Sequence, residues 1–312
     1  MQDLSYILSL TSPTFLLIAI GYLVVKLGWM PQENVRPLAW FVVNIGLPAA
    51  LFKALSSRSF QDILHYDYLL VYGLGSLLSF ATLFILARLR NKSITECALF
   101  GLGASISNSL MVGFPIITQL FGEQALIPFT LTLIIENLFI LPLALALADT
   151  GQQKNSHFIM AFAKSLPQLI KNPIILSIAF GITSTAFGIQ PPLIVNKVID
   201  VLAVTVAGVS LFAIGGMLVG LKTKGMVTDL SSIVVGKLII HPLFVFVFLL
   251  FFPDIPLLFQ HVAILLACMP MFSIFAVIGM RYHYGGLCSA VLLPTTLVSF
   301  VTINVVVWFI SS

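Results

Sequence analysis

Residues 105–115 read Ser-Ile-Ser-Asn-Ser-Leu-Met-Val-Gly-Phe-Pro, a polar patch inside a long apolar run. Pro115 has no N–H group, and its ring clashes with the carbonyl four residues earlier, so it interrupts or kinks a helix. Gly113 adds backbone freedom, and the serines with Asn108 can replace the lost hydrogen bonds. A similar interruption, Cys-Met-Pro-Met-Phe-Ser, occupies residues 268–273. The sequence therefore predicts two broken helices.

The chain as a whole is too apolar for a water-soluble domain. Of 312 residues, 59% are hydrophobic and only 8% are charged, against roughly a quarter in an ordinary soluble protein. Lipid must therefore be the solvent for most of the surface. The basic residues are scattered through short loops, which argues against a nucleic-acid partner. The three cysteines show no metal or disulfide spacing and are predicted to be packing residues: Cys97, Cys268 and Cys288.

Apolar runs of about 20 residues, long enough to cross the hydrocarbon core as helices, occur ten times along the chain. The predicted fold class is an all-α polytopic membrane protein. The halves are residues 1–150 with helices 1–5 and residues 168–312 with helices 6–10, joined by a cytoplasmic linker at 151–167. The predicted spans are 5–27, 35–55, 67–88, 94–121, 125–148, 168–188, 196–220, 229–252, 256–281 and 285–310.

The basic residues orient these spans. Eleven of the fifteen Lys and Arg residues fall on the side of the 151–167 linker, three fall on the other side, and Lys237 lies inside a span. Cytoplasmic loops carry the excess of positive charge. Both termini are therefore predicted to be extracytoplasmic, in a multi-pass protein of the cell inner (plasma) membrane.

Five spans per half is an odd number, so the second half enters the membrane in the opposite sense. This parity is typical of inverted-repeat transporters, whose site lies at the midplane between the repeats. Matching residues 121–126 with 284–289 gives weak internal similarity. On that match Pro115 falls near Ile278 rather than Pro270, which requires an insertion or an asymmetry between the halves.

A half-helix that begins at the midplane presents unpaired N–H groups and a partial positive charge. Two such ends in antiparallel sense predict a site for a carboxylate. An alternative is that each proline kink only aids packing, with Ser and Asn bonding between helices. The candidate substrate-binding residues are Ser107, Asn108, Ser109, Gly113, Pro115, Pro270, Met271 and Ser273.

Several segments together resemble the auxin efflux carrier family, in order and over nearly the whole chain. They are Asn108 with 113–115 and 121–123, Lys171–Ile175 with Gly181 and 188–192, Ser210–Met217, and Met269–Pro270 with Tyr282 and 289–291. The resemblance implies a 5+5 inverted repeat with crossed fourth and ninth helices, elevator-type movement and anionic substrates. The bacterial, PIN-like members are described as malate or malonate permeases, which implies a carboxylate. Plant members carry polar residues at both breaks, whereas here Met269, Met271 and Phe272 occupy the second.

Three ionisable residues lie inside predicted spans and are candidates for ion coupling or charge. Glu136 lies near the midplane, where a charged side chain is costly and is a functional candidate by default. It could carry a proton, or it could form a structural hydrogen bond or pair with Lys237. Lys237 and His241 share a helix face. Lys237 could attract an anion or extend to the surface, and His241 could bond a carbonyl freed by Pro242.

The function predicted from these observations is secondary active transport of small organic anions, such as malate, malonate or auxin-like acids. An anion channel or facilitator is the alternative, although no filter-like run or ring of charge is visible. No catalytic grouping or phosphate-binding loop indicates an enzyme. No cofactor is expected. Coupling to H⁺ or Na⁺, and a homodimer within the lipid bilayer, are left open.

Overall fold

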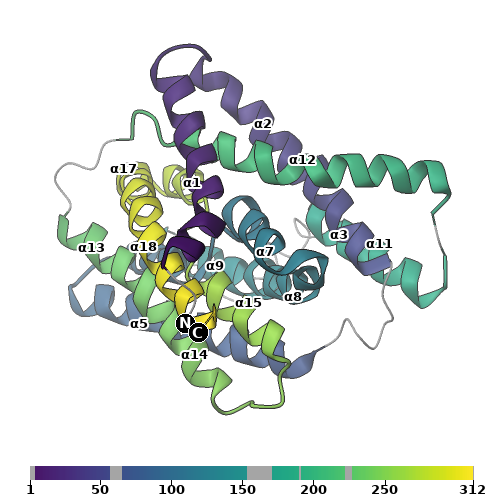
Figure 1. Ribbon diagram of the computed structural model, residues 1–312. Helices are drawn as coiled ribbons and strands as arrows, with labels where there is room; N and C mark the ends of the chain where they lie inside the picture. The colour runs from purple at the N-terminus through teal and green to yellow at the C-terminus, as the bar shows by residue number, and fades with distance from the viewer. Residues whose placement is uncertain (1–3, 57–64, 153–170, 190, 222–226, 312) are drawn as a thin grey trace. The chain divides into compact units, whose positions relative to one another are not determined.

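The computed structural model describes residues 4–56, 65–152, 171–189, 191–221 and 227–311 (Figure 1). All named elements in these ranges are helices, and the only extended pairing there is an isolated antiparallel bridge between Ser107 and Met271. This confirms the all-α prediction. Helices satisfy their own backbone hydrogen bonds, as a chain in lipid requires. Most of the predicted linker 151–167 lies outside the described residues.

The chain divides into two compact units, each built from separate stretches of sequence. Unit 1 comprises Met1–Tyr66, Ser109–Leu131 and Ile170–Val219. Unit 2 comprises Asp67–Asn108, Thr132–Leu169 and Gly220–Ser312. Each unit therefore takes helices from both the N-terminal and the C-terminal half of the chain.

Unit 1 packs around the long helix α12 (Leu193–Met217), which contacts α1, α2 and α3 (Figure 1). Glycines allow the closest approach. A Cβ added to Gly215 would lie 1.9 Å from the Ile18 carbonyl oxygen, and one added to Gly21 would lie 2.0 Å from that of Phe212. Small residues at such interfaces let helix backbones meet in membranes. The other helices are α1 Leu4–Lys26, η1 Gln32–Asn34, α2 Val35–Phe41, η2 Val42–Gly46, α3 Leu47–Ser56, η3 Ser109–Gly113, α7 Phe114–Phe121, η4 Gly122–Ala125, most of α8 Leu126–Ile135, and α11 Pro173–Ala186.

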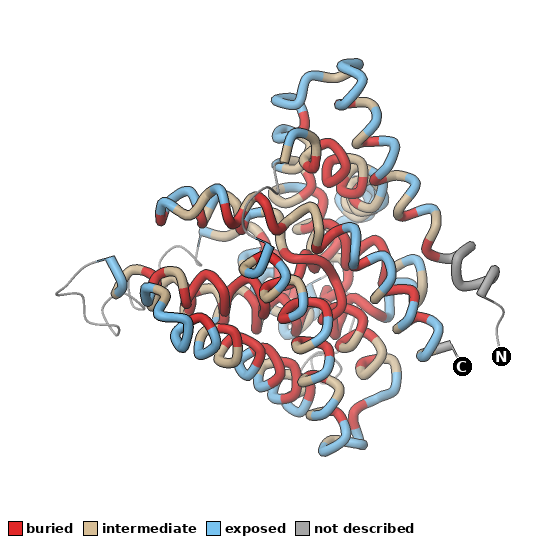
Figure 2. Tube along the Cα trace, turned by 90° about the vertical axis from the view of Figure 1, so that its left-hand side faces the viewer, coloured by how far each residue is buried: buried red, intermediate tan, exposed pale blue. Residues whose placement is uncertain are grey.

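Unit 2 places α6 (Ile94–Ser105) among several neighbours, including α9, α13 and η6. Gly101 and Gly103 of α6 lie against Phe80 and Ile233, where an added Cβ would meet side-chain atoms at 2.9 Å. Figure 2 shows the resulting mixture of buried and exposed positions along each helix. The other helices are α5 Tyr66–Leu89, η5 Glu136–Ile140, α9 Leu141–Gln152, α13 Val227–Val235, η6 Gly236–Ile240, α14 His241–Leu249, α15 Leu257–Ala267, α16 Phe275–Arg281, α17 Gly285–Ala290 and α18 Leu292–Ser311.

Four short π-helices share a sequence feature: each ends two residues before a proline. They are η2 before Pro48, η3 before Pro115, η5 before Pro142 and η6 before Pro242. A proline ring clashes with the carbonyl four residues earlier and offers no N–H to it. Widening the preceding turn to the π form relieves that clash without ending the helix. Glu136 and Lys237 both lie in such wide turns.

The described helices are apolar enough for a multi-pass membrane protein. Six are long enough to cross a bilayer, and four shorter apolar helices accompany them. On α12, Val204 and Ile194 expose 80% and 78% of their surface, as expected where lipid is the solvent. The count of ten spans stays a prediction. The three cysteines are buried and free, which confirms their expected packing role.

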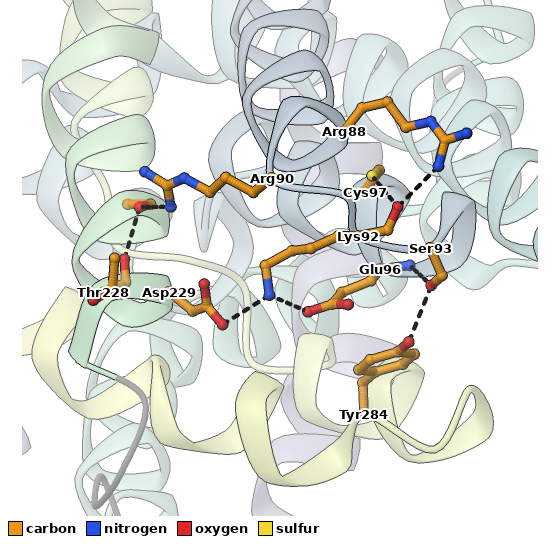
Figure 3. A network of polar contacts seen from close by, with 10 residues as sticks. Arg88, Arg90, Lys92, Ser93, Glu96, Cys97, Thr228, Asp229 and Tyr284 are labelled. Carbon is orange, nitrogen blue, oxygen red and sulfur yellow. Dashed lines mark hydrogen bonds and ion pairs between the residues drawn. The ribbon is translucent and has the colours of Figure 1, made fainter.

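A polar network joins the ends of several unit 2 helices around Lys92, which lies between the predicted spans 67–88 and 94–121 (Figure 3). The Lys92 ammonium forms ion pairs with Glu96 at 2.5 Å and with Asp229 at 2.9 Å. Partial burial opposes its charge, but hydrogen bonds and attraction to the two carboxylates outweigh this and raise the pKa of Lys92 above its ordinary 10.5. Ser93 caps α6 by accepting from the Glu96 N–H and bonds the Tyr284 hydroxyl.

Candidate functional site

The first helix break lies at residues 106–108. Helix α6 ends at Ser105, and Ile106 is extended, with φ −105° and ψ 132°. The Ser105 hydroxyl donates to the Gly101 carbonyl of the same helix, and the Ile106 N–H donates to the Leu102 carbonyl, which would otherwise be unpaired at the helix end. Ser107 and Asn108 are buried, with 3% and 5% of their surface exposed. A short polar segment thus sits within an apolar interior.

The second break follows Ala267, the last residue of α15, and α16 begins only at Phe275. Met269 donates its N–H to the Leu266 carbonyl, and Met269 and Met271 are buried. Ser273 is half-buried. The break therefore carries one hydroxyl among apolar side chains, as the sequence indicates.

The two breaks meet, and both belong to unit 2. Asn108 donates its N–H to the Pro270 carbonyl at 2.7 Å, next to the bridge between Ser107 and Met271. The Asn108 side chain donates from Nδ2 to the Ser273 hydroxyl at 3.0 Å. The structure thus brings together five of the eight predicted substrate-binding residues, from segments more than 160 positions apart.

The other three candidates belong to unit 1. Ser109 and Gly113 bound the π-helix η3, and Pro115 lies in the first turn of α7; all three are buried. The sequence places the interruption at Pro115, but the non-helical residues precede η3 instead. The helix tolerates Pro115 because the preceding turn widens, so the proline marks a π-turn rather than the break itself.

Glu136 lies at the first break, buried with 3% exposed. Its Oε1 accepts from the Ser107 N–H at 3.1 Å and from the Tyr72 hydroxyl at 3.1 Å. Because the Asn108 N–H is taken by Pro270, two of the N–H groups expected to be unpaired at this break already have acceptors within unit 2. A ligand at this point would meet side-chain donors before backbone ones.

Lys237 is fully buried, so the prediction that its side chain could extend to the surface is wrong. Its ammonium donates to the Ser107 hydroxyl at 2.7 Å and to the Ala267 carbonyl at 2.8 Å, which keeps it inside. It also lies 2.8 Å from His241 Nδ1. Ser107 therefore links the two ionisable residues: its N–H donates to Glu136 and its hydroxyl accepts from Lys237.

Three residues of α5 that sequence reasoning missed complete this network. The Ser76 hydroxyl lies 2.9 Å from His241 Nε2, Tyr72 bonds Glu136, and the Tyr68 hydroxyl lies 2.8 Å from Thr132. Tyr68, Tyr72 and Ser76 are spaced by four residues and so share one helix face. That polar stripe in an apolar helix is the signal that could have identified them.

The arrangement offers hydrogen-bond donors to a ligand. Across the described residues, no group of three or more His, Cys, Asp or Glu side chains could hold a metal ion. The Asn108 amide and the Ser273 hydroxyl can each donate to an oxygen. The buried ammonium of Lys237 bonds the hydroxyl of Ser107, the residue before Asn108.

The sequence profile of the family described as "Membrane transport protein" matches residues 6–307. The chain belongs to this family. It is the auxin efflux carrier family named above on the motifs, so that assignment is confirmed. Family membership agrees with the apolar helices of the fold and identifies a multi-pass membrane transport protein.

Two proteins with known names are similar to the chain. The chain is 29% identical over 311 residues to a protein of Rhizobium meliloti (strain 1021) named "Putative malonate transporter", covering 98% of this chain and 96% of that protein. It is 24% identical over 249 residues to the mouse "Lysosomal cholesterol signaling protein", covering 73% of this chain. That match spans 28% of the mouse protein's length.

Proposed function

We propose that this chain is a secondary active transporter of small organic anions, with carboxylates such as malonate or malate as substrates. The observation that carries the proposal is the pairing of two helix breaks inside unit 2, through the Asn108 N–H and the Pro270 carbonyl. Irregular backbone is tolerated at membrane depth where it is buried in protein or lines a cavity, and paired breaks mark transporter sites. The malonate relative supports the substrate class.

The substrate site would form around Asn108 and Ser273. In the present structure the Asn108 amide donates to the Ser273 hydroxyl. A carboxylate oxygen can accept from both groups, and hydrogen bonds to a charged partner are stronger than neutral ones. The substrate would therefore replace a bond between two donor groups with two charge-assisted bonds.

A 5+5 inverted repeat is the proposed architecture, with ten spans and crossed fourth and ninth helices. The match of 121–126 with 284–289 is an offset of 163 positions. The same offset carries the break at 106–108 onto 269–271, where the bridge to Met271 lies. The mismatch seen with Pro115 therefore disappears when the breaks themselves are compared, which supports the repeat.

Elevator-type alternating access fits the division into units. Unit 2 contains both breaks with Glu136, Lys237 and His241, so it could carry the substrate as one body. We further propose an inner-membrane location with both termini extracytoplasmic, on the charge distribution. A homodimer and coupling to H⁺ belong to the same proposal, and the Na⁺ coupling that the sequence left open is addressed through Lys237 below.

Counterflow in proteoliposomes tests the proposal. Vesicles loaded with unlabelled malonate should accumulate external labelled malonate transiently, and uptake should saturate with concentration. A panel of mono- and dicarboxylates would rank the substrates. The alternative, an anion channel, would give flux that rises without saturation and no counterflow. Absence of any carboxylate flux in correctly folded protein would contradict the proposed function.

A further inference from the structure

The ammonium group of Lys237 is held in the way that a bound cation is held. None of the Lys237 side chain is exposed. A protonated lysine has three N–H donors and no acceptor, and three acceptors lie within 2.8 Å: the Ser107 hydroxyl, the Ala267 carbonyl and His241 Nδ1. The number of acceptors equals the number of protons that the charged form offers.

Two of these acceptors belong to the helix breaks. Ser107 lies in the first break, and Ala267 ends α15 immediately before the second. The carbonyls at a helix C-terminus carry partial negative charge, so a positive charge there is favourable. The ammonium therefore forms hydrogen bonds to both interrupted helices, next to the place where the two breaks pair.

The third acceptor is oriented by a neighbour. If His241 accepts from Lys237 at Nδ1, the ring proton is on Nε2 and is donated to the Ser76 hydroxyl, 2.9 Å away. The imidazole is then neutral and adds no second positive charge. With that tautomer, the three acceptors that contact the ammonium are all neutral.

Glu136 supplies the opposite charge through Ser107. The Ser107 N–H donates to Glu136 Oε1 at 3.1 Å, while the Ser107 hydroxyl accepts from Lys237 at 2.7 Å. A buried carboxylate without a compensating positive charge is strongly unfavourable. The breaks therefore need one positive charge at this position.

We propose that Lys237 is a tethered cation, which supplies at the helix breaks the positive charge that a bound monovalent metal ion would otherwise supply. Hydroxyl, carbonyl and carboxylate oxygens are the ligands that hard cations prefer. At the ammonium, Ser107 provides a hydroxyl oxygen and Ala267 a carbonyl oxygen. Glu136 provides a carboxylate on the other side of Ser107. Anion uptake by this chain therefore requires no Na⁺. The inference depends on the proposed function only for its uptake measurement.

Two substitutions at Lys237 test this proposal. Lys237→Ala leaves space for a small cation, whereas Lys237→Met fills the space with an apolar side chain. Melting temperature of the purified protein and malonate uptake in proteoliposomes would be measured with choline, Na⁺ or propylammonium as the cation. Wild-type protein should behave identically in all three. Lys237→Ala should lose about tenfold or more of its uptake in choline and regain uptake and melting temperature with Na⁺ or propylammonium. Lys237→Met should regain neither.

Three results would overturn the proposal: a Na⁺ requirement in the wild type, full uptake by Lys237→Met, or a Lys237→Ala protein that no cation stabilises or reactivates. If the single variants fail to fold, the double variant Glu136→Gln/Lys237→Met removes both charges together. Its uptake should be lost, and wild-type uptake would reject the role. If the wild type carries no carboxylate, the proposed function fails, and the melting response of Lys237→Ala still decides this inference.

Discussion

Replacing Asn108 with alanine separates the role of this residue in folding from its role in binding. The substitution removes the hydrogen bond from Nδ2 to Ser273 but keeps the backbone bond from the Asn108 N–H to Pro270. A neutral side-chain hydrogen bond contributes about 1 kcal/mol to stability. The breaks should therefore stay paired, and the variant should fold with a modestly lower melting temperature.

The cost in transport should be larger. A hydrogen bond to a charged partner contributes about 1.5–3 kcal/mol, so the lost amide donor should raise KM for malonate by about 10- to 150-fold. Concentration-dependent uptake in proteoliposomes measures this change. Ser273→Ala should have a similar effect, and the double variant should cost less than the sum, because the two groups share one ligand oxygen.

Asn137→Ala is the matched control. Its amide donates to the Leu133 carbonyl of its own helix at 2.9 Å, within the same unit. This variant loses the same chemical group from a membrane helix, and its KM should stay close to that of the wild type. A folded Asn108→Ala protein with unchanged KM would remove Asn108 from the substrate site and refute the reasoning.

Three further predictions concern charge and packing. Glu136→Gln keeps an acceptor oxygen for its partners but cannot ionise, so the pH profile of uptake should change; an identical profile would exclude Glu136 as the proton carrier. Gly215→Ala places a Cβ 1.9 Å from a backbone oxygen and should lower the stability of the fold by about 1–3 kcal/mol or more, measured as lost folded yield. In the control Gly208→Ala, the added Cβ meets nothing within 4 Å, so this change should be neutral or stabilising. Lys92→Met should lower stability by about 1 kcal/mol. Because the pKa of Lys92 is raised in the folded protein, its contribution to stability is complete below the ordinary value of 10.5 and is lost only at higher pH. The difference in melting temperature between the variant and the wild type should therefore be constant between about pH 6 and pH 9.

The two interrupted segments could be located approximately from the sequence. Long apolar runs and prolines act locally, so helix content and the two weak points at 105–115 and 268–273 follow from residue chemistry alone. Five residues expected at the site do come together at the paired breaks. Asn108 and Ser273 are polar residues in otherwise apolar segments, and this alone made them candidates for the site.

The tertiary structure decided where the first break lies and what satisfies it. Pro115 suggested the wrong position, because a π-turn can absorb a proline without ending a helix. Glu136 and Lys237 meet at Ser107 across separations of 29 and 130 residues, and Tyr72 joins them from α5. In lipid the outward face of a helix is as apolar as its inward face, so hydrophobic periodicity does not reveal which way a side chain points. The sequence by itself determined the helices, their interruptions and the family, whereas only packing fixed the rotation of each helix and hence the partners of its buried charges.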